Sequence, residues 1–160
     1  MSWHYKTYNI PVEKNLSQYA KSLFNDLQWN MMFKDLVHCN YQNHKHIYTD
    51  GSKTNNSVAS AVWSETFQIK AKLPPSCSIF TAELYAILCA ITYIRQQTGI
   101  YVIFTDSLSS VEALQNPYPI KHHLISQILS VISECAPSKI TIDWVPSHVG
   151  IKGNVSADSL

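Results

Sequence analysis

Ile100-Tyr101-Val102-Ile103-Phe104-Thr105-Asp106 is an apolar and β-branched run that ends on an acid. Residues 100–105 are apolar on both faces, which is typical of a central strand covered by helices. A helical pattern over about 81–98 precedes the run and ends at Gly99, as a helix with a glycine cap would. Two helices follow: one stops at Asn116-Pro117, and the next spans about 122–135. Strands that alternate with helices predict an α/β domain.

Three shorter strands are expected before this region, at about 46–51, 57–64 and 67–72. Their close spacing predicts an antiparallel meander. A last strand is expected at about 139–145, and a last helix begins near Gly153-Asn154. The predicted fold is therefore α/β: a five-stranded mixed sheet, with a three-stranded antiparallel meander plus two parallel strands, flanked by helices.

Residues 1–44 are interpreted as a helical linker or extension that precedes a domain spanning 45–160. Apolar residues recur there at helical spacing, at Leu16, Ala20, Leu23, Leu27 and Met31. Asn15 or Ser17 is the expected cap of that helix, and residues 40–44 form the loop that ends it. No chemistry is predicted in this segment, which we expect to lie on the domain or on a neighbouring domain.

Length and composition limit the class of protein. A chain of 160 residues with 46% hydrophobic and 14% charged residues fits a globular domain plus an extension. No apolar run approaches the roughly 18 residues that a membrane span needs, and the first residues do not resemble a secretory signal. The four cysteines form no C-x-x-C pair and are expected to be reduced, which favours an intracellular setting without distinguishing nucleus from cytoplasm. A monomer is expected.

Four acids stand where an acidic side chain is costly: Asp50, Glu83, Asp106 and Asp158. Asp50 and Asp106 end predicted strands that would be neighbours, and Glu83 is expected in the first turn of an apolar helix. Each has an ordinary alternative: a turn at Asp50, a helix-dipole contact at Glu83, an N-cap at Asp106 and a solvated position at Asp158. Together, with few bases nearby, they favour a metal site.

Carboxylate oxygens are hard ligands, so Mg²⁺ is favoured, with Mn²⁺ as an alternative, over Zn²⁺. Two ions about 3.5–4 Å apart would bridge a phosphodiester. The net charge of +1 hides a further feature: from Lys45 onward there are eight Lys and Arg against eight Asp and Glu. If metal neutralises four of these acids, eight bases face four acids, and the domain becomes cationic toward a polyanion.

Four ordered segments closely resemble a type-1 ribonuclease H domain, most like the version fused to the reverse transcriptase of non-LTR retrotransposons. They are His46-Ile47-Tyr48-Thr49-Asp50-Gly51-Ser52-Lys53, Thr81-Ala82-Glu83-Leu84-Tyr85-Ala86-Ile87, Phe104-Thr105-Asp106-Ser107-Leu108-Ser109-Ser110 and Trp144-Val145-Pro146-Ser147-His148-Val149-Gly150-Ile151-Lys152-Gly153-Asn154, the last continuing to Asp158. The resemblance covers about 45–160, and residues 1–44 are similar to the connector that precedes such a domain.

The resemblance implies hydrolysis of the RNA strand of RNA–DNA hybrids, leaving a 3′-hydroxyl and a 5′-phosphate, within a retroelement polyprotein that has a reverse transcriptase upstream. The metal-binding acids would be Asp50, Glu83, Asp106 and Asp158. His148 would assist proton movement or product release, because imidazole exchanges protons near neutral pH. Gly51 and Ser52 would allow close approach of the sugar-phosphate chain. Ser52, Ser78 and Thr81 are candidate donors to the RNA 2′-hydroxyl, with cap and turn chemistry as their alternative.

Three departures from the family pattern affect the expected activity. The basic helix that many relatives use is absent after Pro119, where Lys121, His122 and His123 form either a small substitute patch or a solvated helix start. Val155 replaces the usual acid after Gly153-Asn154.

Only two residues follow Asp158, so the last helix is expected to be incomplete and to fray, which would leave Asp158 poorly held and the chain a weak enzyme or a fragment. Two alternatives stay open. One is a non-catalytic domain that binds hybrid or braces a polymerase. The other is a transposase or integrase, which the Asp50-Gly51-Ser52 strand and the Ser147-His148 loop disfavour.

Overall fold

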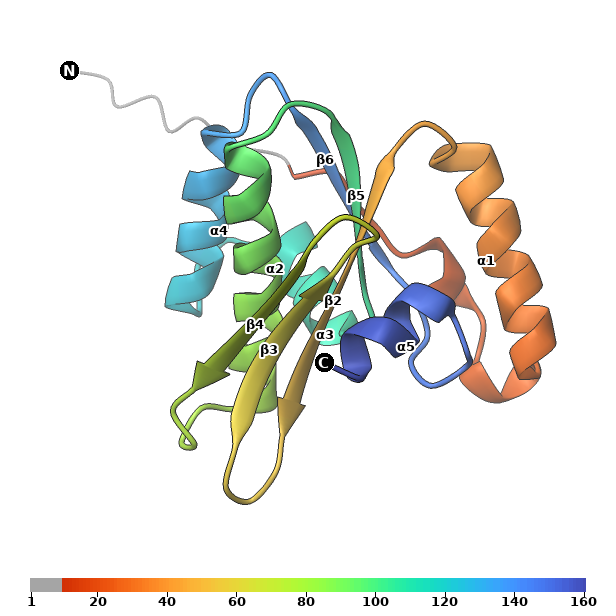
Figure 1. Ribbon diagram of the computed structural model, residues 1–160, viewed down its shortest axis with the longest axis horizontal. Helices are drawn as coiled ribbons and strands as arrows, with labels where there is room; N and C mark the ends of the chain where they lie inside the picture. Colours follow the sequence, from red (N-terminus) through yellow and green to blue (C-terminus); the bar gives the residue numbers. More distant parts are fainter. Residues whose placement is uncertain (1–9) are drawn as a thin grey trace.

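Six strands form one mixed sheet in the computed structural model, which describes residues 10–160 (Figure 1). In sheet order the strands are β1 (Val12–Glu13), β6 (Lys139–Trp144), β5 (Ile100–Thr105), β2 (Lys45–Lys53), β3 (Val58–Trp63) and β4 (Gln68–Leu73). The first four lie parallel to their neighbours, whereas β2, β3 and β4 form an antiparallel meander. The meander and the parallel strands are confirmed. The sheet has six strands rather than five, because β1 is too short to show a periodic pattern in the sequence.

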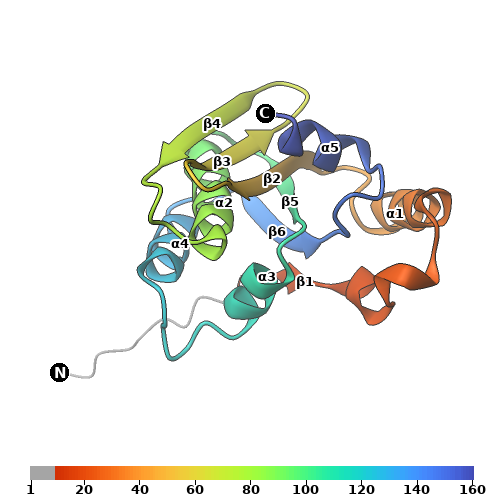
Figure 2. The same ribbon diagram turned by 90° about the horizontal axis from the view of Figure 1, so that it is seen from below.

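Helices cover both faces of the sheet (Figure 2). On one face lie α2 (Ile79–Arg95), α3 (Leu108–Gln115) and α4 (His123–Ser133), and on the other lie α1 (Asp26–Asn40) and α5 (Lys152–Asp158). In residues 10–160, no helix combines the length and the apolar character that crossing a membrane requires. The sheet therefore has one buried layer on each side, as the apolar sequence of β5 predicted.

Helix α2 is the main helix of the first layer, and it ends earlier than predicted. Ser78 caps it by accepting a hydrogen bond from the Thr81 amide, and Ile87, Ile91 and Ile94 are fully buried against the sheet. The predicted glycine cap at Gly99 is wrong, because the helix already ends at Arg95. Gly99 instead bonds to the segment that starts β6: its amide donates to the Ser138 hydroxyl, and its carbonyl accepts from Lys139.

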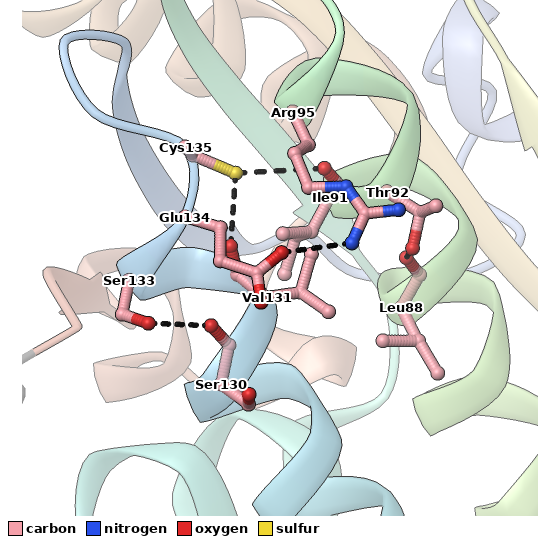
Figure 3. Close-up of polar contacts among 9 residues, drawn as sticks. All are labelled: Leu88, Ile91, Thr92, Arg95, Ser130, Val131, Ser133, Glu134 and Cys135. Carbon is pink, nitrogen blue, oxygen red and sulfur yellow. Dashed lines mark hydrogen bonds and ion pairs between the residues drawn. The ribbon is translucent and has the colours of Figure 1, made fainter.

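Helices α2 and α4 are joined at their C-terminal ends (Figure 3). A guanidinium nitrogen of Arg95 lies 2.8 Å from the Glu134 carboxylate. Next to this ion pair, the buried Cys135 thiol lies 3.3 Å from the Val131 carbonyl oxygen and 3.6 Å from that of Ile91. All four cysteines are free, so Cys135 acts as a packing thiol, as predicted.

The second layer begins with α1, whose position differs from the prediction. Asn25 and Gln28 form a capping box, so the helix starts at Asp26 rather than near Leu16. Its buried face carries Trp29 and Phe33, whereas Leu27 and Met31 of the predicted stripe are 70% and 58% exposed. Two other residues of that stripe lie before α1 in short 3-10 helices, where Leu16 is buried and Leu23 is 62% exposed. The two aromatic residues therefore determine which face of α1 is buried. Residues 10–44 pack on the sheet, while a domain division at residue 45 stays a prediction.

Candidate active site

Two of the predicted acids meet at the ends of the central parallel strands. Strands β2 and β5 pair in parallel with Thr49 opposite Thr105, so Asp50 and Asp106 follow matched positions. Asp50 is buried within β2, and Asp106 is half-buried directly after β5. The predicted neighbourhood of these two strands is confirmed, and it places two carboxylates side by side.

Glu83 approaches this pair from α2. It lies in the second turn rather than the predicted first turn, because the Ser78 cap starts the helix at Ile79. The backbone of α2 lies against β2 at Gly51, where an added Cβ would be 2.7 Å from the Glu83 amide nitrogen. Asp50, Glu83 and Asp106 each offer a carboxylate oxygen, and these oxygens all lie within 4.8 Å of one another.

Burial and mutual repulsion disfavour ionisation of these acids. Burial, then Asp106, then Asp158 raise the pKa of Asp50 to about 8. Burial and repulsion from Asp106 and Asp50 raise the pKa of Glu83 to about 9, although a hydrogen bond from Gly51 opposes this. Burial also raises the pKa of Asp106, against a hydrogen bond from Asn154 and the nearby His148. The three groups would hold negative charge together only with a cationic partner.

The donor set fits a hard divalent cation. All three ligands are carboxylate oxygens, which suit Mg²⁺ or Mn²⁺ better than a softer metal. Glu83 Oε2 is buried and has no hydrogen-bond partner in residues 10–160. A buried charged oxygen without a partner is strongly destabilising, so a cation at this point would satisfy it.

The fourth acid and the histidine lie at the rim of the site. Asp158, the last residue of α5, is outside the group of three, but it is close enough to Asp50 to contribute to the raised pKa of that acid. Its carboxylate lies 4.0 Å from His148 Nδ1, and both side chains are well exposed. His148 adopts a positive φ of 56° in the loop before α5, and this backbone conformation is uncommon for a residue other than glycine.

Asn154 is a site residue to which no role was assigned from sequence. Its side chain is buried in α5 and donates from Nδ2 to Asp106 Oδ2 at 3.2 Å. Trp144 at the end of β6 donates to the Asp106 backbone oxygen at 3.2 Å, so two elements hold this acid. In the sequence, the available clue was that Asn154 is an amide side chain at the predicted start of the last helix. Its contact with Asp106 forms only when the loop before α5 is folded.

The comparison with protein families agrees with this geometry. A family model described as RNase H matches residues 42–160. The chain belongs to the RNase H family. Among curated proteins, no match is found. RNase H domains are metal-dependent ribonucleases that act on RNA–DNA hybrids, and the mixed sheet with its helices is the fold expected of one.

The hydroxyls predicted to contact substrate in this RNase H domain lie near the acids. Ser52 is exposed on β2, two residues beyond Asp50. Ser78 caps α2 and donates to Thr81 Oγ1, and that oxygen lies 3.0 Å from His122 Nε2. Ser78 and Thr81 thus have the cap chemistry that was their alternative, and His122 joins them to the start of α4. Their role toward substrate stays a prediction.

The RNase H carboxylates lie where β5 ends beside β2, in the middle of the sheet. A cavity of about 550 Å³ is at the opposite end of these strands, where Lys45, Trp63 and Tyr101 are among the lining residues and none of the four acids is.

Proposed function

We propose that this RNase H domain hydrolyses the RNA strand of RNA–DNA hybrids, using two divalent cations, Mg²⁺ or Mn²⁺. The observation that carries the proposal is the convergence of Asp50, Glu83 and Asp106 within 4.8 Å in a chain of this family. Asp158 is proposed as the fourth ligand, from α5, which lies on the face of the sheet opposite to α2. When bound, such cations offset the charge of the phosphodiester and of the leaving oxygen during in-line displacement.

The residues of the chain have separate tasks in this proposal. Water attacks phosphorus, the bond from phosphorus to the 3′ oxygen breaks, and a proton reaches that oxygen, which leaves a 3′-hydroxyl and a 5′-phosphate. Asn154 fixes the orientation of Asp106 through its hydrogen bond. His148, exposed and 4.0 Å from Asp158, carries the proton or assists release of the 5′-phosphate.

Recognition of RNA is assigned to residues around Asp50. The missing side chain of Gly51 makes room for the backbone of α2, so the close approach at this residue is to the helix, and Ser52, exposed on β2 next to it, is the residue proposed to meet the sugar-phosphate chain. Ser78 and Thr81 offer further hydroxyls at the start of α2. A contact to the 2′-hydroxyl would distinguish RNA from DNA.

The biological setting is proposed from the amino-acid sequences of the four motifs. They are most similar to RNase H domains that accompany the reverse transcriptase of non-LTR retrotransposons. We therefore place the chain inside the cell, as a monomeric part of a retroelement polyprotein, with a polymerase domain as the proposed upstream partner.

A cleavage assay tests the proposal. A hybrid labelled on its RNA strand is incubated with the protein and Mg²⁺, next to duplex DNA and duplex RNA of the same sequence. We expect RNA products with 3′-hydroxyl and 5′-phosphate ends from the hybrid alone, and loss of cleavage in Asp50→Asn. Nicking of duplex DNA would instead assign the chain to the transposase class.

A non-catalytic hybrid-binding domain is the second candidate function. Its support is that Asp158 lies outside the group of three acids and is well exposed. In that case intact protein binds the hybrid in the presence of Mg²⁺ or Mn²⁺ but leaves the RNA strand uncut.

A further inference from the structure

Two lysines of the edge strand β4 lie on the same face of the sheet as Asp50. In the register of the meander, Asp50 pairs with Ala61, and Ala61 pairs with Lys70. Two residues along, Ser52 pairs with Ala59, and Ala59 with Lys72. Because paired residues of antiparallel strands point to the same face, both lysines share the face of the carboxylate, about 10 Å away across two strand spacings.

The surface between the acid and the lysines has only small side chains, and it is covered at Ala61, which is buried, but open at Ser52 and partly open at Ala59. Its floor is made of the small side chains of Ser52 and Ala59. On this face α5 covers β2 and reaches β3, whereas α2 lies on the opposite face (Figures 1 and 2). In the described part of the chain no helix covers this face of β4, and Lys70 and Lys72 are exposed.

The charge of this surface is unbalanced. Residues 45–73 contain four lysines but only two acids, Asp50 and Glu65. No ion pair within residues 10–160 involves Lys70 or Lys72. The two lysines are two residues apart on a strand, hence about 6.8 Å apart at the backbone. A nucleic-acid strand carries a charge about every 3.4 Å of helix axis, so each lysine can meet a different phosphate.

We propose that Lys70 and Lys72 bind the phosphodiester backbone of the hybrid where it leaves the carboxylate site, and that Ser52 and Ala59 form the floor over which that strand passes. This inference rests on the proposed function and adds to it a second set of contacts, made by the meander. The lysines act as positioning residues: they hold the strand, while the acids 10 Å away, roughly two strand spacings, act on it.

A purely structural role for the same lysines is the competing explanation. Lysines on an edge strand hinder pairing with the edge of another molecule. This role predicts that their loss changes the oligomeric state, with no change in the salt dependence of hybrid binding.

The test compares Lys70→Gln/Lys72→Gln with the charge-preserving Lys70→Arg/Lys72→Arg. The matched control is Lys34→Gln/Lys139→Gln, which removes two exposed lysines from α1 and from the start of β6. Hybrid affinity is measured by fluorescence anisotropy from 50 to 200 mM salt, with Mg²⁺, in the Asp50→Asn background, so that no strand is cut. Cleavage by otherwise unchanged protein is measured separately and tests the proposed function on its own.

We expect the Gln pair to weaken binding about 10-fold and to reduce the slope of log affinity against log salt by about 1.4–1.8, since each phosphate contact contributes about 0.7–0.9. The Arg pair and the control should keep the original slope. In cleavage, the Gln pair should raise KM and leave kcat unchanged. An unchanged slope in the Gln pair, a slope that Arg does not restore, or dimers in size-exclusion chromatography with the slope retained would each overturn the proposal.

Discussion

Two acidic side chains in the described part of this domain are buried with one carboxylate oxygen that has no hydrogen-bond partner. They are Glu83 at the site and Asp143 in β6. At the site, other acids converge on the same point, which indicates a cation. Asp143 is stabilised in a different way, because its other oxygen accepts a hydrogen bond from the Tyr41 hydroxyl at 2.8 Å. This pair joins β6 to the segment that follows α1.

Asp143→Asn should flatten the dependence of stability on pH. Burial raises the pKa of Asp143 to about 6, against the opposing hydrogen bonds from Tyr41 and Trp144. The folded state therefore keeps a proton that the unfolded state loses above about pH 4, so stability falls as pH rises from about 4 to 6. The free energy of unfolding falls by about 3 kcal/mol over this pH range, and the Asn variant should not show this decrease.

Urea unfolding at pH 4 and pH 7 measures this difference. The exposed Asp35→Asn on α1 serves as the control and should follow the unchanged protein at both pH values. Equal pH dependence in Asp143→Asn and the unchanged protein would contradict the assignment.

Asn154→Ala should weaken the metal site without unfolding the domain. The variant loses the hydrogen bond that holds Asp106, and loss of such a supporting contact reduces metal affinity or activity by about 10–100-fold. Cleavage of hybrid as a function of Mg²⁺ concentration measures the shift. Asn43→Ala, in the exposed turn before β2, should leave the Mg²⁺ dependence unchanged.

At the scale of elements, the predictions from sequence succeeded where one pattern determined the outcome. The apolar run 100–105 placed the central strand, and the acids that end the predicted strands became neighbours in the sheet. The predictions from sequence failed where two patterns fitted the same segment equally well and only a tertiary contact determined which one was buried. In α1, two overlapping apolar stripes had helical spacing, and the larger area buried by Trp29 and Phe33 selected the other one. Asn154 was missed because its partner lies 48 residues away.

The seating of α5 on β2 depends on a residue without a side chain. A Cβ on Gly153 would lie 2.1 Å from Cε2 of the Tyr48 ring, so Gly153→Ala must push α5 away from the sheet. Overpacking of this kind destabilises by about 1–3 kcal/mol. Because α5 carries Asn154 and Asp158, hybrid cleavage should fall as well.

A double-mutant cycle with Tyr48→Ala identifies the cause. Removing the ring makes room for the added methyl group, so the Gly153→Ala change should be nearly neutral in that background. A full destabilisation by Gly153→Ala in the presence of Tyr48→Ala would show that the ring contact is not responsible.

At the scale of the whole molecule, the sheet carries an apolar layer on each side, and the segment before residue 45 supplies part of one layer. Trp29 is fully buried in that layer, and its indole donates to the Lys21 carbonyl. Trp29→Ala should therefore destabilise the whole protein by about 3–5 kcal/mol in one cooperative transition.

Leu27→Ala is the matched control, since Leu27 is on the same helix and 70% exposed. It should change stability by less than about 0.5 kcal/mol. Thermal or urea unfolding gives both values. If Trp29→Ala produced two separate transitions, residues 10–44 and the rest of the domain would be independent folding units.

Divalent cations should stabilise the entire fold, and more strongly at high pH. Repulsion and burial raise the pKa of Asp50 to about 8 and that of Glu83 to about 9, so at pH 5 a cation must displace protons to bind. Mg²⁺ should therefore raise Tm more at pH 8 than at pH 5, and chelation should reverse the effect. Glu83→Gln should reduce the Mg²⁺ shift at pH 8. An equal Mg²⁺ shift at both pH values would place the binding elsewhere.

The close approach at Gly51 has a consequence for how the site can change over time. Because main chain rests on main chain there, the spacing between Asp50 and Glu83 is set by the scaffold and not by the flexibility of either carboxylate. The backbones that carry the two acids are therefore held at a fixed distance from each other. Replacing one of these acids by another ligand would alter the chemistry of the site and keep the backbone spacing. Any larger residue in place of Gly51 would change the spacing itself.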